Sequence, residues 1–330
     1  MSVFAIENYN PKLGLLDTEK GICLIKTFFQ KELSSNLNLY RVSAPIFVDP
    51  QTGLNDNLSG HEEAVSFDLT DNSHLEIVQS LAKWKRNALK KYNLKGLYTD
   101  MNAIRKNEKL DNFHSVYVDQ WDWEKTITKE DRNINFLKEI VNKIYLSIKN
   151  TETYICGIFP SLCRKLPENI FFITSEELLK LYPNLNAKQR EYEITKKYKA
   201  VFIIGIGCLL SNNTIHDDRA ADYDDWNLNG DILVWYDLLD RPLELSSMGI
   251  RVNSTSLKNQ ISFKKEEFKF SFQYHKDVLS DLLPLTIGGG IGQSRLCMFM
   301  LDKAHIGEVQ SSYWSDADKA ICLNKNIKLL

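Results

Sequence analysis

The stretch that decides the expected fold reads Thr286-Ile287-Gly288-Gly289-Gly290-Ile291-Gly292-Gln293-Ser294-Arg295-Leu296. Its apolar start predicts the end of a β-strand. Four glycines within five positions then predict a bend whose backbone can lie close to a flat or anionic group. The apolar residues that follow predict a buried helix with Arg295 in its first turn. A helix N-terminus and a guanidinium at one place suit a phosphate or a carboxylate.

The familiar nucleotide-binding motifs do not match this stretch. A P-loop requires Lys followed by Ser or Thr after its glycines, whereas Gly292 is followed by Gln293 and Ser294. The dinucleotide fingerprint requires a third glycine where Gln293 stands. A glycine-rich bend in front of a core helix, with no ligand at all, accounts for the glycines equally well. Evidence for a binding site must therefore come from the rest of the chain.

The composition is that of an ordinary globular protein. The chain has 330 residues, 43% of them hydrophobic and 25% charged, which is enough for one or two domains. A formal net charge of -2 argues against binding to nucleic acid or to a membrane surface. The six cysteines form no Cys-x-x-Cys pair, and neither a signal peptide nor a membrane-spanning segment is evident. These features predict a cytoplasmic protein.

Hydrophobic spacing predicts an α+β fold with a mostly antiparallel β-sheet flanked by helices. A helix is expected from Asp17 to 36–38, followed by one strand over 39–48. Pro45 within that strand indicates a sheet edge or an interface, because proline cannot donate to a sheet ladder. The alternating aromatic residues at 268–274 fit a strand or one face of a helix. The other expected elements are a hairpin of 96–105 and 115–123, helices at 130–150 and 187–199, and strands at 170–173, 200–206, 231–235 and 243–247.

Several polar residues stand on these apolar strands, where a buried charge needs a partner. Arginines and acids on one sheet, beside a glycine-rich segment, would form a site for an anionic ligand with a divalent cation. The acidic segment 216–225 could bind a transition metal through His216. No second histidine or cysteine has ligand spacing, so a solvated acidic loop is favoured. The polar residues on apolar strands are Arg105, Gln120, Asp122, Asp231, Glu244 and Arg251.

Three motifs occur in the order found in class II aminoacyl-tRNA synthetases. The helix before 39–48 and the strand with Pro45 resemble motif 1, Arg105 with the strand 115–123 resembles motif 2, and the glycines followed by Arg295 resemble motif 3. Within that fold, the chain resembles the ammonia-dependent asparagine synthetase (aspartate–ammonia ligase) family over nearly its whole length. The stretches that carry this resemblance are 56–60, 80–86, 114–124, 222–226, 228–235, 244–252 and 286–296.

The resemblance implies a single catalytic domain, residues 1–330, that makes L-asparagine from L-aspartate, ammonia and ATP. The reaction would pass through a β-aspartyl-adenylate and release AMP and diphosphate. Arg105 would hold the α-phosphate, and Arg295 the distal phosphates or the adenine. Asp231 and Glu244 would hold Mg²⁺. The further expected ATP contacts are Ser115, Arg219, Asp224, Gly288, Gly289, Gly290 and Gly292.

The same resemblance implies the contacts with aspartate. Lys85 would hold the side-chain carboxylate, and Arg251 a carboxylate of the substrate. Asp56, in a loop that could close over the site, would either bind the α-amino group or deprotonate ammonium, and both roles stay open. The residues expected to orient the substrate are Ser80, Gln120, Asp122 and Ser246.

Residues 17–48 would form the interface of a homodimer, as motif 1 does in class II synthetases. Asp231 and Glu244 are farther apart in sequence than the metal-binding acids of aspartyl-type synthetases, with a turn through 240–242 between them. The chain also lacks an N-terminal nucleophilic cysteine, which favours free ammonia as the nitrogen donor. Two alternatives remain open: an aspartyl-type synthetase paralogue with the same adenylation residues, and a non-catalytic regulatory subunit, which would tend to lose them.

Overall fold

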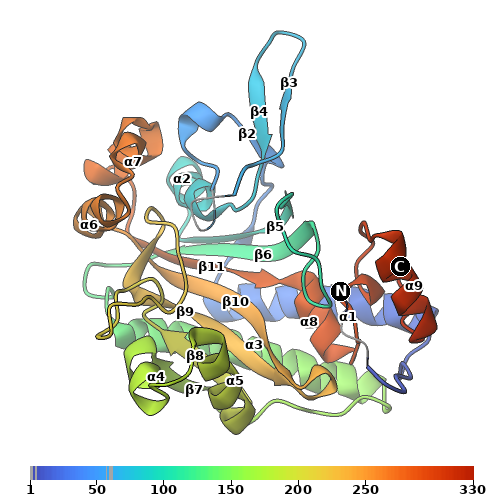
Figure 1. Cartoon of the computed structure of the whole chain (residues 1–330). Helices are drawn as coiled ribbons and strands as arrows, with labels where there is room; N and C mark the ends of the chain where they lie inside the picture. The colour runs from blue at the N-terminus through green and yellow to red at the C-terminus, as the bar shows by residue number, and fades with distance from the viewer. Residues whose placement is uncertain (1–2, 4–5, 57, 59–61) are drawn as a thin grey trace.

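The computed structural model describes residues 3, 6–56, 58 and 62–330. Its main feature is an eight-stranded sheet with the strand order β1-β5-β6-β11-β10-β9-β8-β7 (Figure 1). The outermost pairs, β1–β5 and β7–β8, are parallel, and the pairs between them are antiparallel. The expected α+β fold with a mostly antiparallel sheet is therefore confirmed. The strands are β1 (Tyr40–Arg41), β5 (Gly96–Ile104), β6 (Tyr117–Thr126), β7 (Phe171–Thr174), β8 (Ala200–Ile204), β9 (Asp224–Tyr236), β10 (Arg241–Arg251) and β11 (Thr286–Gly292).

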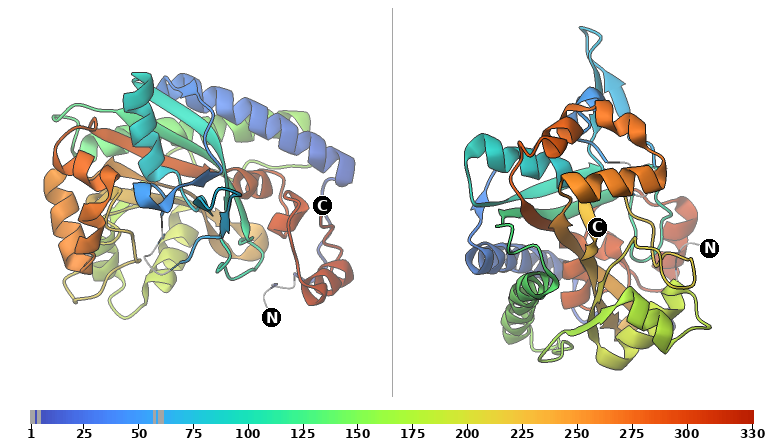
Figure 2. Two further views of the ribbon diagram at one scale, coloured as in Figure 1. Left: turned by 90° about the horizontal axis from the view of Figure 1, so that it is seen from above. Right: turned by 90° about the vertical axis from the view of Figure 1, so that its left-hand side faces the viewer.

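Two long helices, α1 (Leu15–Leu37) and α3 (Ile134–Ile158), lie side by side along one face of this sheet (Figures 1 and 2). Their apolar stripes pack on the strands, as Phe29 does on Trp121 at a ring-centroid distance of 4.6 Å. Among the described residues, no helix has the length and apolarity to cross a bilayer. The other helices are α2 (Ala82–Tyr92), α4 (Ser175–Leu181), α5 (Ala187–Tyr198), α6 (Ser254–Lys264), α7 (Gln273–Leu279), α8 (Gln293–Met300) and α9 (Asp316–Asn324), with short 3-10 helices η1 (Pro50–Thr52), η2 (Asp237–Leu239), η3 (Glu267–Ser271) and η4 (Ile306–Glu308).

The two faces of the central strands differ in chemistry. On β6, Trp121 and Trp123 belong to the apolar core beneath α1 and α3. Gln120 and Asp122 alternate with them and line a cavity on the opposite face. Because side chains of a strand alternate between its two faces, a single strand serves both the core and the polar site.

The prediction of one strand over residues 39–48 is wrong. Only Tyr40–Arg41 pairs with the large sheet, as its edge strand β1. Residues 42–46 contain Pro45, which lacks an N–H for a sheet ladder, and they interrupt the strand. The chain then enters β2 (Phe47–Val48), part of a three-stranded sheet with β3 (Ser66–Asp68) and β4 (His74–Ile77) that projects from the body (Figure 1).

Two further elements differ from expectation. Helix α3 begins at Ile134, because the Asn133 side chain accepts a hydrogen bond from the Phe136 N–H, and it runs eight residues beyond the expected end at 150. For the aromatic residues at 268–274, the helical alternative is confirmed: they lie in η3, in α7 and at the junction between them. The expected turn at 240–242 lies earlier, at Asp237–Leu239 and Asp240, and Arg241 already opens β10.

Candidate active site

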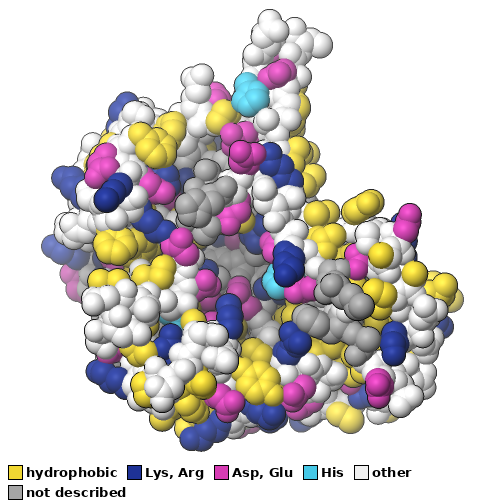
Figure 3. Space-filling view, in the orientation of Figure 1, with side chains coloured by type: hydrophobic (Ala, Val, Ile, Leu, Met, Phe, Trp, Pro, Cys, Tyr) yellow, Lys and Arg dark blue, Asp and Glu magenta, His cyan; other side chains and the backbone are white. Residues whose placement is uncertain are grey.

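A cavity of about 330 Å³ opens on the sheet face opposite α1 and α3, and acidic and basic side chains surround this hollow in Figure 3. Asp231 and Gly288 do not line it, although each contacts a residue that does. Asn57, Ser59 and Gly60, from the family-like stretch 56–60, lie outside the described residues. The predicted residues that line the cavity are Asp56, Ser80, Lys85, Arg105, Ser115, Gln120, Asp122, Arg219, Asp224, Glu244, Ser246, Arg251, Gly289, Gly290, Gly292 and Arg295.

The glycines do not form the predicted bend. They lie in β11, which pairs with β6 on one side and β10 on the other. A Cβ added at Gly288 would lie 1.9 Å from Glu124 Oε2, and one at Gly290 would lie 2.2 Å from Gln120 Oε1. Glycine is therefore required where polar side chains from β6 cross over β11. The spacing of these glycines reflects room for side chains of the site rather than a turn around a ligand.

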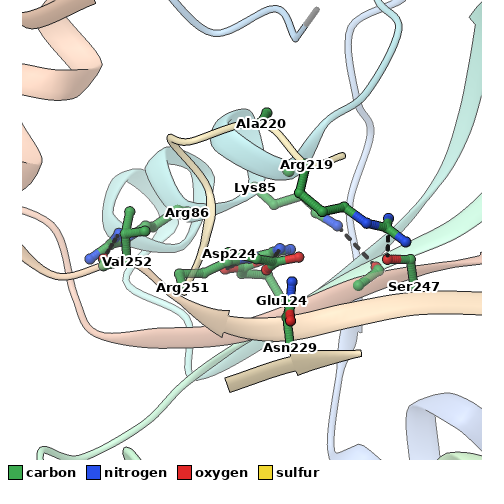
Figure 4. Close-up of polar contacts among 12 residues, drawn as sticks. Lys85, Arg86, Glu124, Arg219, Ala220, Asp224, Asn229, Ser247, Arg251 and Val252 are labelled. Atoms are coloured by element: carbon green, nitrogen blue, oxygen red, sulfur yellow. Dashed lines mark hydrogen bonds and ion pairs between the residues drawn. The ribbon is translucent and has the colours of Figure 1, made fainter. Parts of the chain in front are cut away.

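Arg251 lies between two buried carboxylates (Figure 4). Its Nε and Nη2 donate to Glu124 at 2.8–3.1 Å, and its Nη1 donates to Asp224 at 2.5 Å. Burial acts to lower the pKa of Arg251, but Glu124 and Asp224 outweigh it and keep that pKa well above its usual value. Sequence reasoning did not single out Glu124, although its alternation with Gln120 and Asp122 on β6 was a usable signal.

Lys85 and Asp122 form a second buried ion pair at the floor of the cavity. The Lys85 ammonium lies 2.6 Å from Asp122 Oδ1 and donates to the Gly289 carbonyl at 3.0 Å. The other oxygen, Asp122 Oδ2, is buried and has no hydrogen-bond partner within the described part of the chain. Ser80 Oγ accepts a hydrogen bond from the Ala82 N–H at the start of α2, the helix that carries Lys85. The free oxygen of Asp122, an acceptor, and the Lys85 ammonium, a cation, thus face the cavity together.

Two arginines lie at other positions in the cavity wall. Arg105 follows β5 and donates from Nη2 to the Gln79 carbonyl at 3.3 Å, while its Nε is buried without a partner among the residues described. Arg295 lies in the first turn of α8, as predicted, and donates to the Glu244 carbonyl at 3.1 Å. Its side chain is 23% exposed, so part of the guanidinium faces the open cavity. Both arginines keep donors available for an anion.

Asp231 and Glu244 stand on the neighbouring strands β9 and β10, so the longer connection between them does not separate them. Asp231 forms an ion pair with Arg219, whose Nη1 also donates to Ser247 Oγ at 3.2 Å. Burial raises the pKa of Asp231 to about 7, with Glu244 adding to the rise and Arg219 opposing it. Oδ1 of Asp231 is buried and has no hydrogen-bond partner in the described chain. This crowding of carboxylates fits a divalent cation.

Asp56 differs from the other buried carboxylates of the cavity, Asp119, Asp122 and Asp224. Those three pair with Lys26, Lys85 and Arg251, whereas Asp56 forms no ion pair with any described residue. One oxygen of Asp56 accepts from the Leu58 N–H at 3.1 Å, and the other, Oδ2, has no described partner. Burial raises the pKa of Asp56 to about 6.

The acidic segment 216–225 is not the solvated loop that was expected. His216 is buried, with Nε2 at 3.0 Å from Glu191 Oε1, and Asp225 pairs with Arg132 at 2.7 Å. Within the described residues, no group of three or more His, Cys, Asp or Glu side chains is arranged to hold a metal ion. The segment therefore contributes paired charges rather than a transition-metal site.

This fold defines a class of protein. The asparaginyl-tRNA synthetase of Pyrococcus horikoshii complexed with asparaginyl-adenylate matches with a TM-score of 0.69, over 91% of this chain and 70% of that chain, at 13% sequence identity. The aspartyl-tRNA synthetase of Entamoeba histolytica matches with a TM-score of 0.62, over 92% of this chain and 58% of that chain, at 14% identity. The chain thus has the catalytic-domain fold of class II aminoacyl-tRNA synthetases.

Sequence comparison identifies the family within this class. A family model described as aspartate-ammonia ligase matches residues 16–326. The aspartate–ammonia ligase of Fusobacterium nucleatum subsp. nucleatum is 56% identical over 325 residues, covering 98% of this chain and 99% of the relative. That of Bacteroides thetaiotaomicron is 53% identical over 338 residues, covering 98% of each chain. This chain belongs to the aspartate–ammonia ligase family, which is a family of enzymes.

Proposed function

We propose that this protein makes L-asparagine from L-aspartate, ammonia and ATP through a β-aspartyl-adenylate, with release of AMP and diphosphate. One observation supports this most directly. A single cavity presents Arg105 and Arg295, which suit phosphates, together with Lys85 and Arg251, which suit a dicarboxylate. The names of the two aspartate–ammonia ligase relatives agree with aspartate and ammonia as substrates.

In the first step, an oxygen of the β-carboxylate attacks the α-phosphorus of ATP. The bond from this phosphorus to the diphosphate oxygen breaks, and diphosphate leaves. The reaction gathers negative charge around the α-phosphorus, and fixed cations nearby lower its cost. Arg105 holds the α-phosphate with donors that the protein leaves unused, and Arg295 holds the distal phosphates or the adenine from the first turn of α8.

Lys85 holds the side-chain carboxylate of aspartate. Arg251 binds a carboxylate of the substrate. The Arg251 guanidinium then contacts both this carboxylate and Asp224. The free oxygen of Asp122, together with Gln120, orients the substrate ammonium group. Ser80 and Ser246 complete the aspartate contacts from α2 and β10. A buried carboxylate holds each of the two cations in place, Asp122 for Lys85 and Asp224 for Arg251, and this supports the proposed substrate contacts.

In the second step, ammonia attacks the acyl carbon and AMP leaves with the electron pair of the acyl–oxygen bond. Ammonia is mostly ammonium near neutral pH, so the protein must take a proton from it. We assign this role to Asp56. Its pKa of about 6 leaves it ionised at neutral pH yet more basic than an ordinary aspartate, and its Oδ2 is unoccupied by other described groups.

Asp231 and Glu244 would hold Mg²⁺, with Arg219 as the group that balances their charge when the ion is absent. When bound, the ion would neutralise phosphate oxygens of ATP. The unpartnered Oδ1 of Asp231 and the influence of Glu244 on its pKa support this assignment. Ser115, Asp224, Gly289, Gly290 and Gly292 line the cavity and complete the proposed nucleotide contacts. Gly288 does not line the cavity, because Glu124 and Arg251 lie over it, and it is left out of these contacts.

The protein would act as one catalytic unit spanning residues 1–330 and as a homodimer through residues 17–48. Tyr40, Ile46 and Phe47 are 65%, 55% and 42% exposed there. Exposed apolar side chains that lie together favour contact with a second copy of the chain. All six cysteines are free thiols, which supports a reducing cytoplasm. The net charge of -2 supports the absence of a nucleic-acid partner.

One assay tests the reaction. The protein is incubated with ATP, Mg²⁺, aspartate and ammonium, and AMP, ADP and asparagine are measured. We expect AMP and asparagine in equal amounts and no ADP. Aspartate-dependent ATP–diphosphate exchange without asparagine would instead identify a synthetase paralogue, and nucleotide binding without turnover would identify a regulatory protein.

The Arg295→Ala variant tests the role of the cavity. We expect ATP–diphosphate exchange to fall by about 10²-fold or more, because Arg295 would stabilise the negative charge that develops on the phosphates. Folding should change little, because the side chain is only half-buried. Arg164→Ala, which removes an exposed arginine outside the cavity, is the matched control. Exchange at the wild-type rate in Arg295→Ala would contradict the assignment.

A further inference from the structure

Asp56, the proposed base, stands in the segment between η1 and β3, outside the helices and strands of the described chain. A catalytic group in such a segment is placed only as precisely as other contacts fix its backbone. Two side chains supply those contacts, Asn55 beside it and Gln79 from the segment between β4 and α2. Both are buried, so their amides lie where a hydrogen bond is costly to lose.

Both main-chain polar groups of Asp56 are held by these two amides. Asn55 Oδ1 accepts hydrogen bonds from the N–H of Asp56 and from the N–H of Gln79, each at 3.0 Å. Gln79 Nε2 donates to the Asp56 carbonyl at 2.9 Å and, at 3.4 Å, to the Glu62 carbonyl. Asn55 Nδ2 in turn donates to the Ile77 carbonyl at 3.2 Å. The backbone of Asp56 is therefore fixed to the segment that follows β4.

Gln79 also contacts the group proposed to bind the α-phosphate. Its carbonyl oxygen accepts a hydrogen bond from Arg105 Nη2 at 3.3 Å. Gln79 thus uses different atoms for the two proposed catalytic groups, its side chain for Asp56 and its main chain for Arg105. A substitution of the side chain leaves the carbonyl in place, so an experiment can separate the two contacts.

We propose that Gln79 is a positioning residue for the second step: its side-chain amide fixes the backbone of Asp56, so that the Asp56 carboxylate faces the cavity and accepts a proton from ammonium. The ammonia that forms then attacks the acyl carbon as AMP leaves. Asp56 lines the cavity, whereas Gln79, within the described residues, does not, so Gln79 acts through Asp56. This inference rests on the proposed function and concerns only its second step.

The decisive experiment is a double-mutant cycle between Gln79 and Asp56. Gln79→Met nearly keeps the size of the side chain and removes its donor, and Asp56→Asn removes the base. Asparagine formation should fall by about 10²-fold or more in Asp56→Asn, because proton transfer is lost. It should fall by about 10-fold or more in Gln79→Met, because the base is misplaced. The double variant should be no slower than Asp56→Asn, since the amide then has no base to position.

Hydroxylamine separates proton transfer from the rest of the reaction. It is a weaker base than ammonia and is largely uncharged near neutral pH, so it attacks the adenylate without needing Asp56. Gln79→Met should therefore form aspartate hydroxamate, and catalyse aspartate-dependent ATP–diphosphate exchange, at rates close to wild type.

Asn150→Ala is the matched control. It also removes a side-chain amide that joins two segments, because Asn150 Nδ2 on α3 donates to Glu32 Oε2 on α1 at 2.7 Å, on the opposite face of the sheet. Asparagine and hydroxamate formation should both stay at the wild-type rate in this variant.

Three results would overturn the proposal. Asparagine formation at the wild-type rate in either single variant would show that the amide does not position a base. Losses that add up in the double variant would show that Gln79 acts independently of Asp56. Equal losses of asparagine, hydroxamate and exchange in Gln79→Met would show that its side chain only supports folding. A wild-type protein that exchanges diphosphate but forms no asparagine would refute the proposed function itself, which is a distinct outcome.

Discussion

Gly290→Ala tests whether β11 is glycine-rich in order to make room for the site. The added Cβ would lie 2.2 Å from Gln120 Oε1 and 3.0 Å from Asp122 Oδ1. An ordinary contact begins near 3.4 Å, so Gln120 must move by about 1.2 Å. A misplacement of about 1 Å in an orienting group can cost about 10²-fold in rate. Because Oε1 is the end of a flexible side chain, we expect a stability loss of only about 1 kcal/mol.

Asparagine formation and urea unfolding measure the two effects separately. The expected result is a kcat reduced by about 10²-fold in a protein that still unfolds cooperatively. Gly157→Ala is the control, because its Cβ would meet nothing within 4 Å on the exposed side of α3. It should leave kcat unchanged and stabilise the helix by up to about 1 kcal/mol. Normal kcat in Gly290→Ala would refute the idea that the glycine makes room for a working Gln120.

Three further predictions concern stability and assembly. Glu124→Gln should destabilise the fold by about 3 kcal/mol in urea unfolding, because the buried Arg251 keeps only one carboxylate partner, Asp224; a loss below about 1 kcal/mol would contradict this. His305 is buried with a pKa lowered by burial to about 4, so wild-type stability should fall by up to about 3 kcal/mol between pH 6.5 and 4, and His305→Asn should flatten that dependence. Ile46→Asp should convert the proposed homodimer to monomers in sedimentation experiments, whereas Leu323→Asp, on the exposed face of α9, should not.

Most of the fold follows from patterns that are local in the sequence. The hairpin of 96–105 and 115–123 was confirmed as β5 and β6, because a period of two in apolar residues needs no distant information. The helix after the glycines was also confirmed, with Arg295 in its first turn. Most of the residues that the family motifs indicated as ligand contacts line one cavity. The motifs identify which residues contribute to the site, whereas the role of each residue remains a proposal.

What the sequence could not show depends on contacts between distant segments. The glycines looked like a bend because nothing nearby in the chain reveals that Gln120 and Glu124 cross over them. The pairing of Lys83 with Asp222 joins positions 139 residues apart, and neither residue stands on an apolar strand that would have drawn attention to it. Acidic residues at 216–225 suggested a solvated loop, because composition does not reveal that partners such as Arg132 are supplied by other elements.

The position of β11 in the sheet also has a consequence for how the chain acquires activity. This strand, from the last seventh of the sequence, inserts between β6 and β10 and joins the two halves of the sheet. A nascent chain on the ribosome therefore cannot complete the sheet until nearly all of it has emerged. Until then the edges of β6 and β10 stay open to wrong partners, so slow translation or early truncation should favour aggregation over a partly active fragment.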